Sequence, residues 1–145
     1  MKQEDKELLL RDLCARLPYG IKCWHESFTS TYTLYAIDSE HAAVNLSPDG
    51  LNFDNSWWNN IEQVKPYLFP FSSMSEKQKK FFKDRPIFLD SENELVVKED
   101  FFGNSQFTML DDWMEVILWL NKNHFDHQGL ISKGLAIDCT NLNIY

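Results

Sequence analysis

The segment from residue 113 to residue 120 constrains the fold of this chain more than any other feature. It places seven large apolar residues in eight positions, with Glu115 as the one interruption. A helix that is apolar almost all round must be covered by the rest of the chain. Thr108 and Asp111 form a weak capping box in front of this run. The sequence therefore predicts a buried C-terminal helix over residues 109–125.

The first residues of the chain predict a helix of a different kind. Between residues 3 and 17, apolar side chains recur at helical spacing and charged side chains occupy the opposite side. Pro18 and Gly20 then end the helix, because proline cannot continue the hydrogen-bond ladder. We expect an amphipathic N-terminal helix with one buried stripe.

The middle of the chain changes to the period of a β-strand. Along residues 21–47, side chains suited to the core alternate with side chains suited to the surface, and turn residues separate the segments. This pattern predicts a three-stranded antiparallel meander. Residues 86–89 and 94–97 predict a short hairpin, and residues 76–84 a short helix. Together these elements predict a single α+β domain over residues 1–145, in which a small antiparallel sheet packs against both main helices.

Charge is distributed unevenly along the chain. The net charge is −8, and residues 86–115 alone carry −7, whereas residues 75–85 carry +3. An acidic chain repels phosphate backbones, so we expect no direct binding of nucleic acid. The acidic block is interpreted as a solvated surface; the alternative is a face that docks a basic partner by imitating nucleic acid. The basic segment is interpreted as a solvated helix face that can neutralise a neighbouring copy, so a homodimer is possible.

The cellular location of the protein is predicted from its apolar segments and its cysteines. The N-terminus has no long apolar core of the kind found in signal peptides, and no apolar stretch is long enough to cross a bilayer. The three cysteines, Cys14, Cys23 and Cys139, form no C-x-x-C pair, which favours free thiols in a reducing compartment. We therefore expect a cytoplasmic protein that does not contact the membrane.

A histidine-rich stretch, residues 123–138, follows the predicted C-terminal helix. Its simplest interpretation is a helix end with a packed tail, in which Gly129 supplies the left-handed conformation. The alternative is a zinc site of Cys23, His25, His124 and His127, in a metal-dependent enzyme or a zinc-stabilised module. These spacings match no standard zinc motif. We accordingly predict no catalytic residue, no metal and no cofactor.

Two adjacent tryptophans offer a better candidate for binding. Trp57 and Trp58 lie among asparagines in a stretch without a sustained period. Exposed aromatic side chains are strong anchors at protein interfaces, although large aromatics are more often buried in the core. We predict Trp57 and Trp58 as the contact residues for an unidentified protein partner.

Three segments of the chain carry a family resemblance. They are ELLLRDLCARLPYGIK, VKPYLFPFSSMSEKQK and WLNKNHFDHQGLISKGLAID, spread over most of its length. They resemble a family of small uncharacterised proteins encoded by prophages and mobile elements of gut bacteria. The resemblance implies an accessory protein of a bacterial cytoplasm and assigns no activity to any residue. The sequence thus predicts a non-enzymatic protein-binding module of phage or mobile-element origin.

Overall fold

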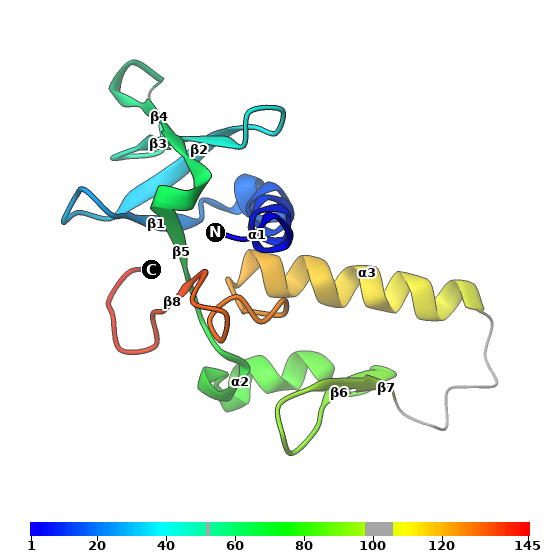
Figure 1. Cartoon of the computed structure of the whole chain (residues 1–145). Helices are drawn as coiled ribbons and strands as arrows, with labels where there is room; N and C mark the ends of the chain where they lie inside the picture. Colours follow the sequence, from blue (N-terminus) through cyan, green and yellow to red (C-terminus); the bar gives the residue numbers. More distant parts are fainter. Residues whose placement is uncertain (52, 98–105) are drawn as a thin grey trace.

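The computed structural model describes residues 1–51, 53–97 and 106–145, and it confirms the α+β fold class. In Figure 1 a sheet with helix α1 forms the upper part of the molecule, and helix α3 extends away below it. The helices are α1 (Gln3–Arg16), α2 (Glu76–Lys79) and α3 (Gln106–Lys122), and a 3-10 turn, η5 (Lys80–Phe82), continues α2. The strands are β1 (Lys22–His25), β2 (Tyr32–Asp38), β3 (Ala43–Ser47), β4 (Trp57–Asn60), β5 (Val64–Leu68), β6 (Ile87–Leu89), β7 (Leu95–Val97) and β8 (Ile137–Asp138).

The main sheet is larger than the predicted meander. Its strand order is β4-β3-β2-β1-β5-β8, with β8 parallel to β5 and the other neighbours antiparallel. The meander itself is present as β1, β2 and β3. Strand β5 was not predicted from the sequence. Four of its five residues are buried, so it lacks the alternation of a strand that has only one buried face. The predicted hairpin is present as β6 and β7.

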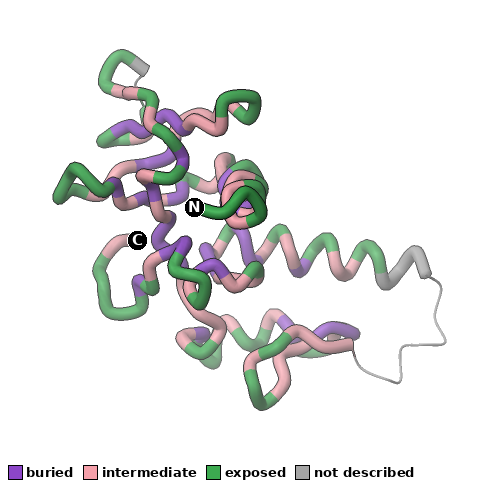
Figure 2. The backbone as a smooth tube through the Cα atoms, in the orientation of Figure 1, coloured by how far each residue is buried: buried purple, intermediate pink, exposed green. Residues whose placement is uncertain are grey.

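Helix α1 covers one face of this sheet. Leu9 and Leu13 of α1 are fully buried in one cluster with apolar residues from the strands and from residues 130–136. Figure 2 shows the buried backbone concentrated where α1 and the central strands meet. The predicted amphipathic N-terminal helix is therefore confirmed, and it ends at Arg16, just before Pro18.

Helix α3 has a second cluster on one side only. Val116 and Leu120 are fully buried in one cluster with apolar residues of η5 and the β6–β7 hairpin, which lie along the same side of the helix in Figure 1. The predicted C-terminal helix is confirmed, but its buried surface is one face rather than its whole circumference. The predicted capping box is wrong, because α3 already begins at Gln106 and Thr108 lies inside it.

A buried ion pair within α1 contacts the segment that follows α3. Arg16 and Asp12 are both fully buried, and the Arg16 Nε–Asp12 Oδ2 distance is 2.7 Å. Arg16 Nη2 also donates to the backbone carbonyl of Phe125 at 2.8 Å. This pair fixes the C-terminal end of α3 against the body of the protein, while the rest of the helix extends outward. None of the helices in the described residues is long and apolar enough to cross a membrane.

Candidate functional site: the exposed face of α3

The four residues of the zinc alternative do not come together in one metal-binding group. His25 packs against the ring of Phe28, with centroids 4.8 Å apart. His124 stacks on the ring of Tyr145 at 4.1 Å. Cys23 is fully buried in the sheet core. Among the described residues, no three His, Cys, Asp or Glu side chains are grouped so that they could hold a metal ion. The structure therefore gives no support to a shared zinc site of these residues.

The histidine-rich stretch is held together as a helix end. His124 takes a left-handed conformation with φ of 60° and is the first left-handed residue after α3. Gly129 is left-handed too, as predicted, with φ of 72°, but it lies further along the chain. His127 Nε2 donates to Asn121 Oδ1 at 2.8 Å. The carboxylate of Asp126 accepts hydrogen bonds from two backbone N–H groups that follow it, those of residues 130 and 131. The side chains of His127 and Asp126 therefore have structural partners, whereas the buried Nδ1 of His124 has no hydrogen-bond partner in the described part of the chain.

Burial sets the titration of the groups near this helix end. Desolvation, with a smaller effect of the Arg16 charge, lowers the pKa of His124 to about 4 and also lowers the pKa of His127. Burial raises the pKa of the Cys23 thiol and raises that of Cys139 to about 11. Both thiols are therefore protonated at neutral pH, which is unfavourable for a nucleophilic cysteine.

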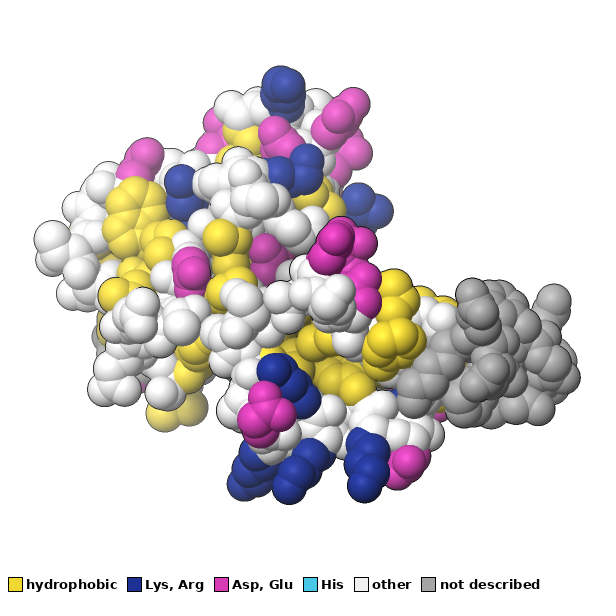
Figure 3. Space-filling view, turned by 90° about the horizontal axis from the view of Figure 1, so that it is seen from below, with side chains coloured by type: hydrophobic (Ala, Val, Ile, Leu, Met, Phe, Trp, Pro, Cys, Tyr) yellow, Lys and Arg dark blue, Asp and Glu magenta, His cyan; other side chains and the backbone are white. Residues whose placement is uncertain are grey.

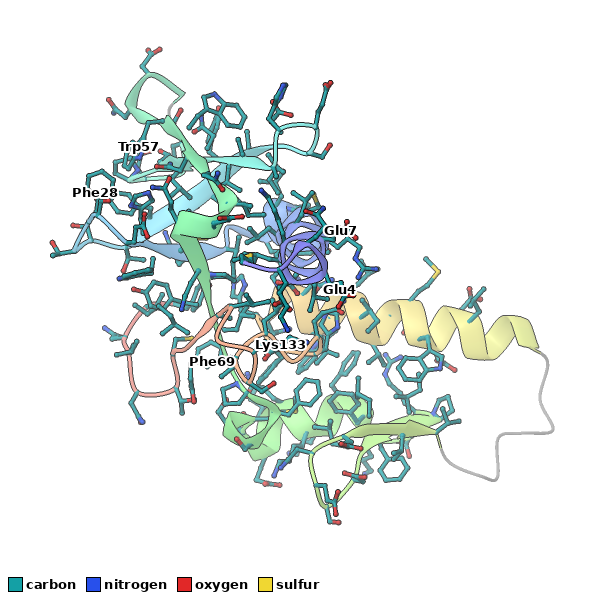
Figure 4. All side chains as sticks on the ribbon, in the orientation of Figure 1. Glu4, Glu7, Phe28, Trp57, Phe69 and Lys133 are labelled. Carbon is teal, nitrogen blue, oxygen red and sulfur yellow. The ribbon has the colours of Figure 1, made fainter. Side chains whose placement is uncertain are left out.

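The two predicted tryptophan anchors do not share a surface. Adjacent residues of a strand point to opposite faces of the sheet, so Trp57 and Trp58 diverge. Trp57 packs against the core and against Tyr32 and Phe28, at ring distances of 4.9 Å and 5.6 Å. Figure 4 shows Phe28 and Trp57 together at this end of the sheet. Trp58 is 50% exposed and remains a candidate contact on the other face.

The acidic block of residues 86–115 is divided between structural tasks and a surface. Asp90 Oδ1 accepts from two backbone N–H groups in the β6–β7 turn. Asp112 and Glu115 on α3 both face Arg85. Glu99 and Asp100 lie outside the described residues. A nucleic-acid mimic requires the carboxylates of residues 86–115 to share one continuous face, and this stays a prediction. Among the described residues, α3 carries exposed carboxylates at Asp111 and Glu115.

The best-organised exposed apolar surface also lies on α3. Leu110, Met114 and Leu118 are 62%, 58% and 52% exposed, and they follow one another at four-residue spacing. Residues four apart lie on one side of a helix, so these three form a continuous apolar stripe. We call them the α3 stripe. It lies on the side opposite to Val116 and Leu120, which are fully buried.

Acidic side chains border the α3 stripe. At 100° per residue, Asp111 and Glu115 fall on the same flank of the helix, next to the stripe, and both are exposed. Glu115 also pairs with Arg85, whereas Asp111 forms no ion pair with another described residue. In the view of Figure 4, Glu4 and Glu7 project from α1 on the side where α3 extends away from the body. A partner that covers the stripe therefore meets a negative border.

This arrangement has the properties of a docking surface for a helix. An amphipathic partner helix binds a hydrophobic strip through its own apolar side chains, which are spaced three, four or seven residues apart. Soluble proteins rarely expose ordered apolar strips that have no partner. The sequence reasoning missed this surface because the run of residues 113–120 is apolar on every side, so its period does not distinguish the covered face from the free one.

No family model, curated protein or solved structure matches this chain.

Proposed function

We propose that this protein is a non-enzymatic protein-binding module, and that the α3 stripe is its docking surface for a basic amphipathic helix of another protein. The observation that carries the proposal is the ordered exposure of Leu110, Met114 and Leu118 beside an acidic flank. The stripe is presented rigidly, because the opposite side of α3 belongs to the second core cluster. Rigid presentation lowers the entropy cost of binding.

The negative charge beside the α3 stripe determines which kind of partner helix fits. Asp111 favours lysine or arginine at the border of the partner helix, and Glu115 adds less because it already pairs with Arg85. Complementary charges speed association and exclude wrong partners. A second copy of the chain is less suitable. In an antiparallel two-fold pair of stripes, the flank with Asp111 and Glu115 would lie beside the same flank of the other copy, so carboxylates would repel one another.

The resemblance noted in the sequence supplies the biological setting of this proposal. A phage or mobile-element accessory protein in a bacterial cytoplasm would act by binding a protein of the host or of the element. A docking surface without a catalytic group suits such a role, because binding alone can block or recruit a partner. Trp58 supplies a second possible contact on a different side of the molecule.

The test uses a short model peptide of leucine and lysine that forms a basic amphipathic helix. Its binding to the full chain is measured by fluorescence anisotropy and compared with that of Met114→Ser/Leu118→Ser. The matched control is Leu142→Ser, which removes an apolar side chain that is 46% exposed and lies outside α3. Circular dichroism checks that both variants are folded.

We expect the peptide to bind the wild-type chain and the Leu142→Ser control equally, and to bind the double variant at least about tenfold more weakly. A peptide with glutamate in place of every lysine should not bind. Equal binding of the lysine peptide to all three proteins would refute the docking surface. Dimerisation of the wild-type chain that is lost in the double variant would assign the stripe to a second copy instead.

A further inference from the structure

A hollow lies on the opposite side of α3 from the stripe, between α3 and the α2–η5 segment. Its volume is about 680 Å³, which is within the usual range of small-molecule sites. It is lined by Ser75, Lys77, Gln78, Lys80, Phe81, Trp119 and Asn123. In Figure 3, which views the molecule from the side of α2, lysine and arginine side chains gather beside an apolar area.

The aromatic wall of this hollow presents ring edges. Phe81 and Trp119 stack face to face at 4.4 Å, and Phe125 also stacks on Trp119, with centroids 5.7 Å apart. The guanidinium of Arg85 lies 4.3 Å from the centroid of the Phe81 ring. With their faces occupied, the two rings offer their edges to the hollow. Ring edges carry partial positive charge and so favour an anion over a stacked base.

The charged groups of the hollow have the same sign. Lys77 and Lys80 line it, and neither makes an ion pair with another described residue. Lys79, in the same helix, differs because it pairs with Glu76 at 2.9 Å. No carboxylate lines the hollow, whereas three other hollows of the described surface each include at least one. Two unneutralised ammonium groups thus face one site in an otherwise acidic chain.

The backbone beneath the lysines is fixed by a capping box. Ser75 Oγ accepts from the backbone N–H of Gln78 at 3.2 Å, and Gln78 Oε1 accepts from the backbone N–H of Ser75 at 2.8 Å. This arrangement leaves the Gln78 amide N–H₂ free of any bond within the box. Asn123 uses its own amide N–H₂ to donate to the Trp119 carbonyl at 2.8 Å, which anchors the other wall. The site is therefore built on ordered elements.

We infer that this hollow binds the phosphate group of a small molecule, held by Lys77 and Lys80 and bordered by the edges of Phe81 and Trp119. Lysine binds phosphate as a point charge, whereas carboxylates are matched best by the planar fork of arginine. Two lysines and no arginine line the hollow, which favours phosphate. The closed aromatic stack offers no free face for a nucleobase, so the phosphate group itself is the recognised part.

Isothermal titration of the full chain with pyrophosphate, at low ionic strength, tests this site. The variant Lys77→Gln/Lys80→Gln removes both ammonium groups from the hollow. The charge-matched control, Lys6→Gln/Lys133→Gln, removes two lysines that lie elsewhere and pair with Glu62 and Asp5. We expect at least about tenfold weaker binding in the first variant and an unchanged dissociation constant in the control.

Equal weakening in both variants would overturn the inference, because it would show attraction to net charge rather than to a site. Failure of the wild-type chain to bind pyrophosphate would overturn it as well. Tighter binding of citrate than of pyrophosphate would contradict the assignment to phosphate. Binding of inorganic phosphate with the same dependence on the two lysines would support it and show that a single phosphate group is sufficient.

Discussion

His124 is expected to make the stability of this protein depend on pH, and the effect can be isolated by one substitution. The imidazole is 8% exposed, and its pKa is lowered from 6.5 to about 4 by desolvation and, to a smaller extent, by the Arg16 charge. In the unfolded chain the imidazole takes up a proton as the pH falls below 6.5, while in the folded chain it stays neutral until about pH 4. Stability is therefore lost as the pH falls through this window.

The size of the effect follows from linkage. A shift of about 2.5 pKa units corresponds to roughly 3 kcal/mol once the window has been crossed completely. Between about pH 7 and pH 5, the same linkage gives a loss of roughly 1.8 kcal/mol in the free energy of unfolding from this residue alone. Other groups titrate too, so the comparison must be made with a variant that lacks only this imidazole.

His124→Asn is that variant, because asparagine accepts the left-handed backbone that His124 adopts with φ of 60°. Urea unfolding of both proteins, followed by circular dichroism, gives the free energy of unfolding at about pH 7 and pH 5. We expect the wild-type loss between the two pH values to exceed that of the variant by roughly 1.8 kcal/mol. Tyr145→Phe keeps the stacked ring and the imidazole, so it should retain the full wild-type loss. Equal losses in wild type and His124→Asn would refute the reasoning.

Three further predictions concern stability and binding. Asp12→Asn leaves the fully buried Arg16 without its counter-charge, so we expect a loss of roughly 3–5 kcal/mol in urea unfolding, and a variant as stable as wild type would contradict the buried pair. Tyr145→Phe removes a hydroxyl that accepts from a backbone N–H of β1 and donates to a carbonyl of β5, both at 3.0 Å, so we expect the free energy of unfolding to fall by about 1–3 kcal/mol. Asp111→Asn/Glu115→Gln should slow association of the lysine peptide and flatten its salt dependence in stopped-flow fluorescence, with little change in dissociation; an unchanged salt slope would show that the flank does not steer binding.

Local periodicity was sufficient to predict the elements that bury one side. The N-terminal helix and strand β1 each carry a period that matches their covered face. Strands β2 and β3 were predicted correctly with the help of their turn residues, although β3 is buried at four of its five residues. Strand β8 could not be predicted, because it has two residues and forms by parallel pairing with β5, about 70 positions earlier. Strand β4 lies in an asparagine-rich stretch with only four residues, too few to establish an alternation.

The candidate sites depended on long-range packing that the sequence does not show. The apolar run in α3 predicted burial correctly for Val116 and Leu120, but which side would remain free depended on where η5 and the β6–β7 hairpin pack. The lysines of residues 76–84 were interpreted as a solvated helix face. The hollow beside them exists because Phe81 stacks on Trp119, a contact between residues 38 positions apart. Such contacts are set by tertiary structure rather than by local pattern.

The free energy gained by covering the α3 stripe indicates what strength of binding it can support. Its three side chains are already about half buried, so covering the remainder contributes roughly 1 kcal/mol each, or about 3–4 kcal/mol in total. A micromolar complex requires about 8 kcal/mol. The stripe alone therefore cannot hold a partner, and charge pairing along Asp111 and Glu115 must add to it. It follows that the stripe fixes the register of a bound helix while the acidic flank governs how fast it binds, and the complex should be weak, transient and sensitive to salt.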